Sequence, residues 1–540
     1  MRDMPTPLVR VLLLAACAIF ALPGSVSAQE INLRNANLYL EHDDVRVQKP
    51  GISLELLRVY NSRSNYRGHF GYGWTTNLDI RCQEGPDGSV LVSDSDGFIL
   101  RYTPQGEPRE RLMMRYVDRL VEARKEQDSR LGTSRNPAWY DSFRQQLIDQ
   151  PELRQQLGQT MASTWVDAAP GNYVSFDRGT ERLQKKPDGS YVRHRADGTV
   201  YTFDDRGLLR SMVDAGGRGL RLDYDRDRRL SKVTHTEGGS FSMTWSSDQR
   251  VTSVLDTEGR RIEYQYSGDD LKQVSGPDGR RRAYDYDSEH NLVSMIDSAN
   301  NAFQVSYDVT RDWVNGVKVG DAITRYAWEV QDPEHYTAVV TAPNGEVTQH
   351  IYDDAEMRLK VITPDGNVTE TLLSACCAKP LEVRERGQVT RYDYDRQARL
   401  VGITYPDGRK VRYTYHPKWS KIVEAMHSSG GRFAYTYDGV GNLTQAGDGA
   451  GRKLSLDYGK NGKVDRIKDQ DGGVYNFVYD VSGRPTRISR QRGGTLAIHY
   501  GVNGEIRSTE VVEGDSSSEE IYAKLREVLL MLEPATGTMQ

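Results

Sequence analysis

The residue types that carry out chemistry are present in this chain, but their spacing matches no catalytic motif. The ten histidines are scattered, and no two stand at a recognised metal-ligand spacing. There is no Gly-x-Ser-x-Gly segment, no His-Glu-x-x-His segment and no phosphate-binding Gly-Lys-Ser/Thr loop. Acidic pairs recur so often as turn residues that choosing two as general acid and base would be arbitrary. We therefore expect no catalytic residues and no cofactor.

Two acidic segments place oxygen atoms as a calcium loop does. They are Asp94-Ser95-Asp96-Gly97 and Asp469-Gln470-Asp471-Gly472. Neither is followed by the later glutamate that completes such a site. We interpret both as turns and expect no metal site.

The cysteines suggest a structural role. If a leader ending at Ala28 is removed, Cys82, Cys376 and Cys377 remain, and an odd count in an oxidising compartment leaves one thiol over. A disulfide could join Cys82 to one of the adjacent pair, or a strained bridge could join the neighbours. Metal binding is disfavoured, because no histidine or third cysteine stands near the pair.

The first residues have the pattern of an export signal. The apolar run over 11–22 is too short to span a bilayer easily, and Val26-Ser27-Ala28 is typical of a cleavage site before Gln29. A competing interpretation is a lipoprotein signal, because Leu14-Ala15-Ala16-Cys17 resembles a box in which Cys17 is acylated. Residues 1–28 are therefore predicted as a signal peptide, and the protein as periplasmic or secreted.

Composition favours a folded β protein outside the membrane. The chain has 540 residues, 37% hydrophobic and 27% charged, with 50 glycines and 31 tyrosines, as expected for short strands joined by tight turns. A net charge of -5 provides no broad basic surface, so nucleic acid is not an expected partner. No later stretch is apolar enough to span a membrane, so we expect no transmembrane segment in the mature chain.

An internal repeat is the main signal in the sequence. Aromatic residues recur about every 21 positions along most of the chain, at places that we call the ladder positions. They include Tyr224, Trp245, Tyr266, Tyr286, Tyr307, Tyr394, Tyr415, Tyr437, Tyr458, Tyr479 and Tyr500.

Each repeat has the pattern of a β-hairpin. Tyr392 and Tyr394 are two apart and share one face of a strand, with Asp393 on the other. Pro406-Asp407-Gly408 is typical of a turn. Fifteen such units give about thirty strands, and an open sheet tolerates only about ten before it curls or splits. The predicted fold is mostly β: tandem hairpins curling into a spiral β-shell or a barrel.

Two helical features interrupt the repeats. Apolar spacing predicts a small helical insertion over 107–169, either a cap on one end of the sheet or a docking site for a partner. Ser517-Ser518-Glu519-Glu520 resembles a capping box and predicts an amphipathic C-terminal helix over 516–540, covering an open strand edge. The remaining modules are predicted at 29–106 and 170–515.

The repeat resembles a known family. Tyr392-Asp393-Tyr394-Asp395, Tyr437-Asp438-Gly439 and Tyr479-Asp480-Val481 look like the YD repeats of Rhs proteins, toxin-complex subunits and teneurins. Upstream, a second motif is similar to the N-terminal module of bacterial Rhs proteins, through Tyr60, Asn61, Ser62, Arg63, Gly71, Gly73 and Trp74. The resemblance implies a spiral shell, which in this family encloses a toxin or supports adhesion.

The resemblance leaves the function open. About forty residues follow Tyr500, so we expect no C-terminal toxin domain. Our first hypothesis is a non-enzymatic extracytoplasmic scaffold that binds a protein, peptide or glycan partner through tyrosine-rich surfaces. The second is a toxin-less shell or carrier in an interbacterial competition or secretion system. The third is a glycan hydrolase with an unrecognised site.

Overall fold

The structure is a computed structural model, and it divides into two compact units. Unit 1 comprises Met1–Asn77 and Met212–Gln540, and unit 2 comprises Leu78–Ser211, so the predicted module 29–106 is shared between them. The structure describes residues 29–94, 98–160, 166–177, 180–298, 300, 302–375, 377–480, 484–491, 494–500, 506–513, 528 and 531–532. The predicted signal peptide, including Cys17, lies outside the described residues.

Unit 1 begins with a small sheet that we call the N-terminal module (residues 29–77). Its strands are β1 Gln29–Asn32, β2 Asn37–Val47, β3 Leu54–Asn61, β4 Arg67–Gly68, β5 Gly71–Tyr72 and β6 Trp74–Thr76. The main sheet has the order β1-β2-β3-β6, and β4 pairs with β5. Buried residues alternate along β3, as in a strand with one face on a core.

The rest of unit 1 is one long antiparallel sheet, which we call the shell. Each strand bonds to the next in chain order. The strands are β15 Gly219–Tyr224, β16 Leu230–His235, β17 Ser240–Trp245, β18 Val251–Asp256, β19 Arg261–Ser267, β20 Asp270–Ser275, β21 Arg281–Tyr286, β22 Leu292–Asp297, β23 Ala302–Asp308, β24 Trp313–Val319, β25 Ala322–Val330, β26 His335–Thr341, β27 Val347–Asp353, β28 Arg358–Ile362, β29 Val368–Leu373, β30 Pro380–Glu385, β31 Gln388–Tyr394, β32 Leu400–Thr404, β33 Lys410–Tyr415, β34 Ile422–His427, β35 Arg432–Tyr437, β36 Leu443–Asp448, β37 Lys453–Tyr458, β38 Val464–Asp469, β39 Val474–Tyr479, β40 Pro485–Arg490, β41 Gly494–Tyr500 and β42 Ile506–Glu513.

Where an aspartate follows the ladder position, it organises the hairpin turn. In the turn after β35, Asp438 Oδ1 accepts hydrogen bonds from the backbone N–H groups of Val440 and Asn442, at 2.9 and 2.8 Å. Its Oδ2 accepts a third bond, from the side chain of Asn442. Asp225 makes the same contacts with residues two and four positions later. This aspartate therefore holds the turn by a local side-chain-to-backbone pattern.

The ladder tyrosines join each repeat to the one before it. Tyr437 donates its hydroxyl proton to the carbonyl of Ile422 at 2.7 Å, and Tyr458 donates to Leu443 at 3.0 Å. The same bond, always 15 residues back, is made by Tyr266, Tyr307, Tyr415, Tyr479 and Tyr500, and by the Trp245 indole N–H. In these repeats the pairing register shifts just before the ladder residue, as at a β-bulge.

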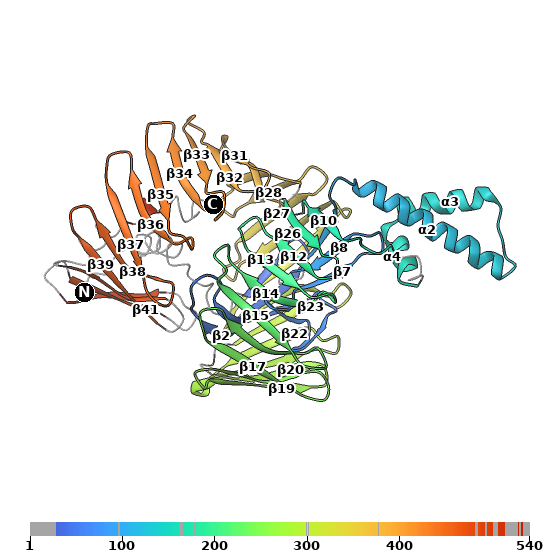
Figure 1. Cartoon of the computed structure of the whole chain (residues 1–540), viewed down its shortest axis with the longest axis horizontal. Helices are drawn as coiled ribbons and strands as arrows, with labels where there is room; N and C mark the ends of the chain where they lie inside the picture. Colours follow the sequence, from blue (N-terminus) through green and yellow to red (C-terminus); the bar gives the residue numbers. More distant parts are fainter. Residues whose placement is uncertain are drawn as a thin grey trace. The chain divides into compact units, whose positions relative to one another are not determined.

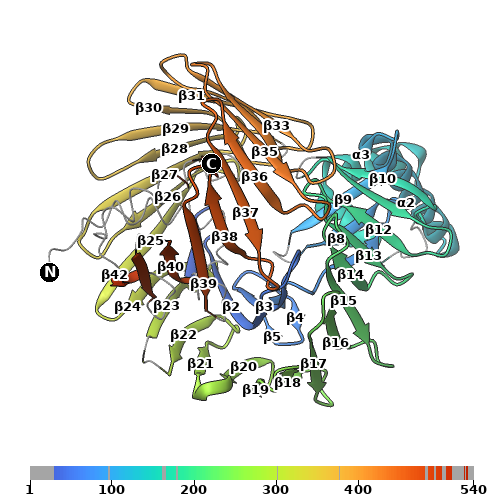
Figure 2. The ribbon, with the colours of Figure 1, turned by 60° about the vertical axis from the view of Figure 1, so that its left-hand side comes forward.

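The shell curls through a full turn of a spiral (Figure 2). Arg218, just before β15, donates from Nη2 to the carbonyl of Val440 at 2.6 Å, although the two residues are 222 positions apart. Lys49 of the module likewise lies beside both Gly239 and Gly462, a nearly equal separation along the chain. The spiral interpretation is thus supported. The barrel alternative is wrong, because the described strands form one long antiparallel sheet that is not a closed barrel.

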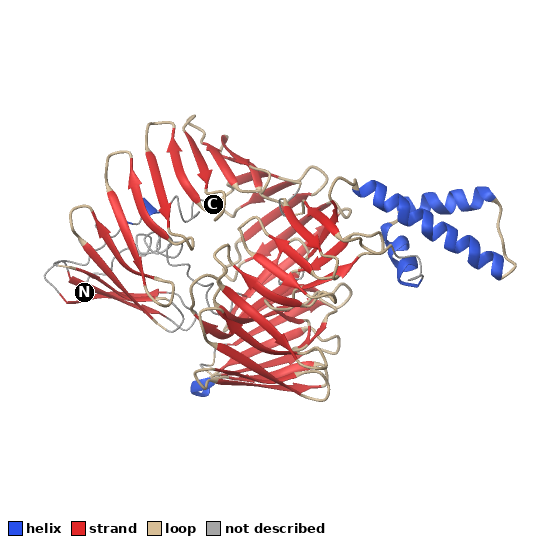
Figure 3. Cartoon of the chain, viewed as in Figure 1, coloured by secondary structure: helices blue, strands red, loops and turns tan. Residues whose placement is uncertain are grey.

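Unit 2 holds a short run of strands and the helices. Its strands are β7 Arg81–Glu84, β8 Val90–Ser93, β9 Ile99–Pro104, β10 Gly171–Ser175, β11 Glu181–Lys185, β12 Tyr191–His194 and β13 Val200–Phe203; β14 Leu209–Val213 crosses into unit 1. The helices are α2 Arg109–Arg130, α3 Pro137–Asp149 and α4 Pro151–Thr160. They pack on one another around Tyr116, Leu120 and Phe143, and form the separate helical cluster in Figures 1 and 3.

A short C-terminal segment completes the core of the later repeats. Val528, Met531 and Leu532 are helical and buried among the apolar side chains of β32 to β41. The hydroxyl of Tyr435 donates to the carbonyl of Met531 at 3.0 Å. The described part of the predicted C-terminal helix therefore covers a sheet face.

Replacing the ladder Tyr458 with phenylalanine tests the bond between repeats. Tyr458→Phe leaves the Leu443 carbonyl without its donor, so we expect a loss of about 1 kcal/mol in the free energy of unfolding, measured by urea denaturation. Tyr405→Phe is the matched control, because Tyr405 packs on the same core and its hydroxyl has no hydrogen bond to any described residue. Equal losses in both variants would contradict the assignment.

Candidate functional site

The predicted N-terminal motif lies where the module meets the shell. Tyr60 is buried, and its hydroxyl accepts from the backbone N–H of Leu292 at 2.9 Å and donates to the carbonyl of His290. Burial raises the pKa of Tyr60. Trp74 is fully buried and donates its indole N–H to the hydroxyl of Tyr286 at 2.9 Å. These motif residues therefore dock the module on β21 and β22.

The other motif residues shape the same contact. Gly71 and Gly73 have φ of 110° and 73°, which favours glycine, and a Cβ at Gly73 would lie 2.8 Å from the Tyr60 ring. Asn61 and Ser62 bond within the module, the Ser62 hydroxyl accepting from the Leu38 N–H at 2.9 Å. Arg63 reaches the shell, donating to the carbonyl of Arg311. The motif is thus brought together as a structural joint.

A buried ion pair stands at the centre of this joint. Arg58 is fully buried and forms a two-pronged ion pair with Asp44, whose side chain is 1% exposed. The hydroxyl of Tyr264, from β19, donates to the same carboxylate at 2.6 Å. Burial opposes the charge of Arg58, but Asp44 outweighs it and raises the pKa of Arg58 further above its ordinary value. The guanidinium also faces the rings of Trp74 and Tyr264.

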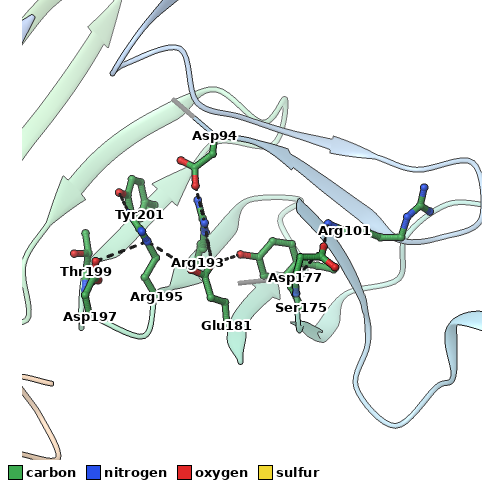
Figure 4. Close-up of polar contacts among 11 residues, drawn as sticks. Asp94, Arg101, Ser175, Asp177, Glu181, Arg193, Arg195, Asp197, Thr199 and Tyr201 are labelled. Carbon is green, nitrogen blue, oxygen red and sulfur yellow. Dashed lines mark hydrogen bonds and ion pairs between the residues drawn. The ribbon is translucent and has the colours of Figure 1, made fainter. Parts of the chain in front are cut away.

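Unit 2 contains a second buried ionic cluster (Figure 4). Arg193 is fully buried and donates from Nη2 to Asp94 at 3.0 Å and to Glu181 at 2.8 Å. Tyr102 donates its hydroxyl proton to Glu181 at 2.5 Å. Arg195 lies beside Glu181 and donates to the hydroxyl of Tyr201 at 3.2 Å.

The Arg193 cluster has the chemistry of a structural element. Asp94 and Glu181 both accept from Arg193, and their side chains are 5% and 4% exposed. The arrangement ties β11 and β12 to the chain after β8 through buried, charge-assisted hydrogen bonds.

A half-exposed stretch of the shell face is the feature best suited to binding. We follow the residue two positions before each ladder position, on the face that contacts the module. It is buried in the early repeats (Leu222, Met243, Tyr264, Tyr284, Val305) and in the late repeats (Tyr413, Tyr435, Leu456, Phe477, Ile498). The four repeats between them have Trp328, Tyr352, Leu373 and Tyr394 at the ladder position. The residues two positions earlier are Tyr326, His350, Thr371 and Tyr392, and each is only partly buried. We call the module-side face of β25 to β31 the open face.

The open face carries aromatic and aliphatic side chains. Tyr336 stacks on Tyr352 with ring centroids 4.8 Å apart, and Tyr326 stacks on Trp328 at 6.2 Å. Strand pairing then places Leu359 opposite Tyr352, Thr371 opposite Leu359, and Val383 opposite Thr371. Among the described residues, the module contacts the first part of this face, where Arg34 lies over Tyr352 and the Leu33 carbonyl accepts from Trp328.

The predicted cysteine and acidic-turn residues lie apart. Cys82 is buried, which raises the pKa of its thiol, and Cys377 Sγ lies 3.4 Å from Ser374 Oγ. Cys376 lies outside the described residues, so the disulfide pairing stays a prediction. Among the described residues, no group of three His, Cys, Asp or Glu side chains is placed to hold a metal ion. Asp94 binds Arg193, and Asp469 accepts from the Gly473 N–H in a turn.

Sequence reasoning missed both buried arginines. A charged residue in a strand is usually expected to face solvent. For Arg58 a signal existed: it follows Leu54 and Leu56 at the two-residue spacing of the buried face. Arg193 likewise follows Tyr191, which is buried.

Family models match three parts of the chain. A domain of unknown function, DUF6531, matches residues 28–102, the RHS repeat matches 267–302, and the teneurin YD-shell matches 332–446. With the tandem hairpins, these matches define the class as YD-repeat shell proteins. The chain belongs to the Rhs/YD-repeat family.

Two curated relatives share part of the chain. It is 26% identical over 341 residues to the tRNA nuclease WapA of Bacillus subtilis (strain 168), covering 62% of this chain and 12% of that protein. It is 23% identical over 269 residues to the probable deoxyribonuclease RhsB of Dickeya dadantii (strain 3937), covering 47% and 17%. The chain thus spans less than a fifth of the length of either relative.

Solved toxin-complex structures are also similar. The Photorhabdus luminescens Tc holotoxin pore has a TM-score of 0.41 at 11% identity, covering 89% of this chain and 29% of that one. A TcdB2-TccC3-Cdc42 complex has a TM-score of 0.41 at 12% identity, covering 89% and 30%.

Removing the Arg193 charge tests its structural role. Arg193→Met removes the cation that donates to the buried Asp94 and Glu181 and leaves Glu181 with Arg195 alone, so we expect unit 2 to lose about 3 to 5 kcal/mol of stability. Deuterium exchange of β11 and β12 measures this loss. Arg210→Met is the control, because the exposed Arg210–Asp204 pair contributes at most about 1 kcal/mol. Unchanged protection in Arg193→Met would overturn the assignment.

Proposed function

We propose that this protein is a non-enzymatic extracytoplasmic scaffold whose open face binds a polypeptide partner. The observation that carries the proposal is the register-matched change in burial. One repeat position is buried on both sides of β25 to β31 and half-exposed within it, at Tyr326, His350, Thr371 and Tyr392. An apolar sheet face of this kind gains free energy when a partner covers it.

A polypeptide is favoured over a glycan by what covers the neighbouring parts of the same face. The module covers the early repeats, and Val528, Met531 and Leu532 cover the late ones. Both covers are polypeptide and insert apolar side chains between the repeats. The open face continues these two contacts without a break in strand pairing, so a third polypeptide segment fits its chemistry.

A second candidate is a carrier role in interbacterial competition or secretion. The relatives WapA and RhsB are named as nucleases, and this chain matches only a part of each. A shell of the same family that works with a separately supplied toxin would use the same open face. In that case the partner is itself a toxic protein.

The extracytoplasmic location is part of the proposal. It rests on the predicted signal peptide over residues 1–28 and on the family. Among the described residues, no helix is long and apolar enough to cross a membrane.

Site-specific photo-crosslinking in the native host tests the open face. A benzophenone amino acid replaces Leu359, which faces the module side, or Lys360, the next residue on the opposite face. We expect a discrete protein adduct from position 359 and none from 360, and loss of co-purification of that same protein from a Leu359→Arg variant.

The outcomes separate the hypotheses. Sequencing a toxic protein in the adduct would select the carrier role. Equal adducts from both positions, or no adduct together with retention of the protein on a glycan column, would overturn the polypeptide proposal.

A further inference from the structure

Histidines concentrate at the joint between the module and the shell. Four of the ten histidines in the chain make contacts between the module and the shell. His42 and His69 of the module contact the shell, and His235 and His290 of the shell contact the module. Histidine is the side chain whose ordinary pKa lies nearest to mildly acidic pH. Two of the four are held neutral by their surroundings.

His42 is the more constrained of these two. It is fully buried, and neither ring nitrogen has a hydrogen-bond partner. It pairs directly across the strands with Arg58, and its ring lies 5.9 Å from Trp74 and 5.8 Å from Tyr284. Burial lowers the pKa of His42 well below its ordinary value, and Arg282 and Arg58 lower it further. A proton on His42 would add a buried positive charge near Arg58 and Arg282.

His235 holds the module from the other side. It is 1% exposed; its Nδ1 accepts from the backbone N–H of Glu237 at 3.0 Å, and its Nε2 lies 2.9 Å from the carbonyl of Ile52 in the module. Because Nδ1 accepts, the proton sits on Nε2 and donates to Ile52. Burial lowers the pKa of His235, although its bond to Ile52 opposes the shift. Protonation of Nδ1 would abolish the Glu237 bond.

We propose that the joint between module and shell is an acid-sensitive latch, which loosens when His42 and His235 take up protons. The two rings lie at separate places along the contact, one against β21 and the other at the end of β16. Protonation of the two histidines weakens the contact of the module with β21 and its contact with the end of β16 in the same pH range. The module then releases the early repeats whose inner face it fills.

The pH range follows from the signs of the shifts. Both histidines have a lower pKa in the folded protein than the ordinary value of about 6.5. Their contribution to stability is complete above that pH and is lost progressively as the pH falls below it. His290 Nδ1 lies 2.8 Å from the carboxylate of Asp270.

Acidic groups also lie near the joint. Asp44 is paired with Arg58 and Tyr264. Burial raises the pKa values of Asp43 and Glu55, so their protonation stabilises the fold and has the opposite sign. Protonation of these two carboxyl groups therefore opposes the loss of stability that we expect from the histidines.

Hydrogen–deuterium exchange of the full chain tests the latch. Exchange rates of β2 and β3 are measured at pH 7.5 and 5.5 and corrected for the intrinsic pH dependence of exchange. We expect protection of these strands to fall at least tenfold at pH 5.5 in the wild type. In His42→Phe/His235→Gln we expect the fall to be less than twofold, with protection of unit 2 unchanged.

A matched control separates the latch from general acid sensitivity. His335→Gln removes an exposed histidine that pairs with Asp332, and it should retain the full tenfold fall. If the wild type shows no fall, the proposal is wrong whether or not the double variant folds. The proposal is also wrong if the double variant loses protection as the wild type does.

Discussion

A curled sheet has an inner face that must be filled. Repeated hairpins can extend an antiparallel sheet indefinitely, but curvature turns one face inward, where apolar side chains need contacts other than water. In unit 1 the N-terminal module supplies these contacts for the early repeats, and the segment around Met531 supplies them for the late ones. The rest of the structure depends on this filling, because the hairpins themselves bond only to their neighbours.

The local architecture was accessible from sequence. Tyr458 and Tyr479 predict strands at the repeat spacing, and the number of strands predicts curling. The turn residues after each ladder position indicate hairpins, although the three bonds made by Asp438 come only from the structure. These features were predictable because each depends on residues within one or two repeats.

The joint was not predictable in the same way. Tyr60 and Trp74 were recognised as a motif, but their partners Leu292 and Tyr286 lie more than 200 positions later. The burial of Arg58 and Arg193 also depends on distant acidic partners, and a single sequence contains no record of such pairings. Alternation of side chains within one strand gave the only hint.

The contact between Arg218 and Val440 has a consequence for how such proteins diversify. Because the bond joins residues 222 positions apart, one circuit of the spiral has a fixed length of chain. Deleting a single hairpin between Arg218 and Val440 would bring a different turn to Arg218. Every later repeat would then lie against a different repeat of the first circuit. Variation in length is therefore expected among the repeats after Val440, or in insertions such as α2 to α4. Neither changes the number of residues in one circuit.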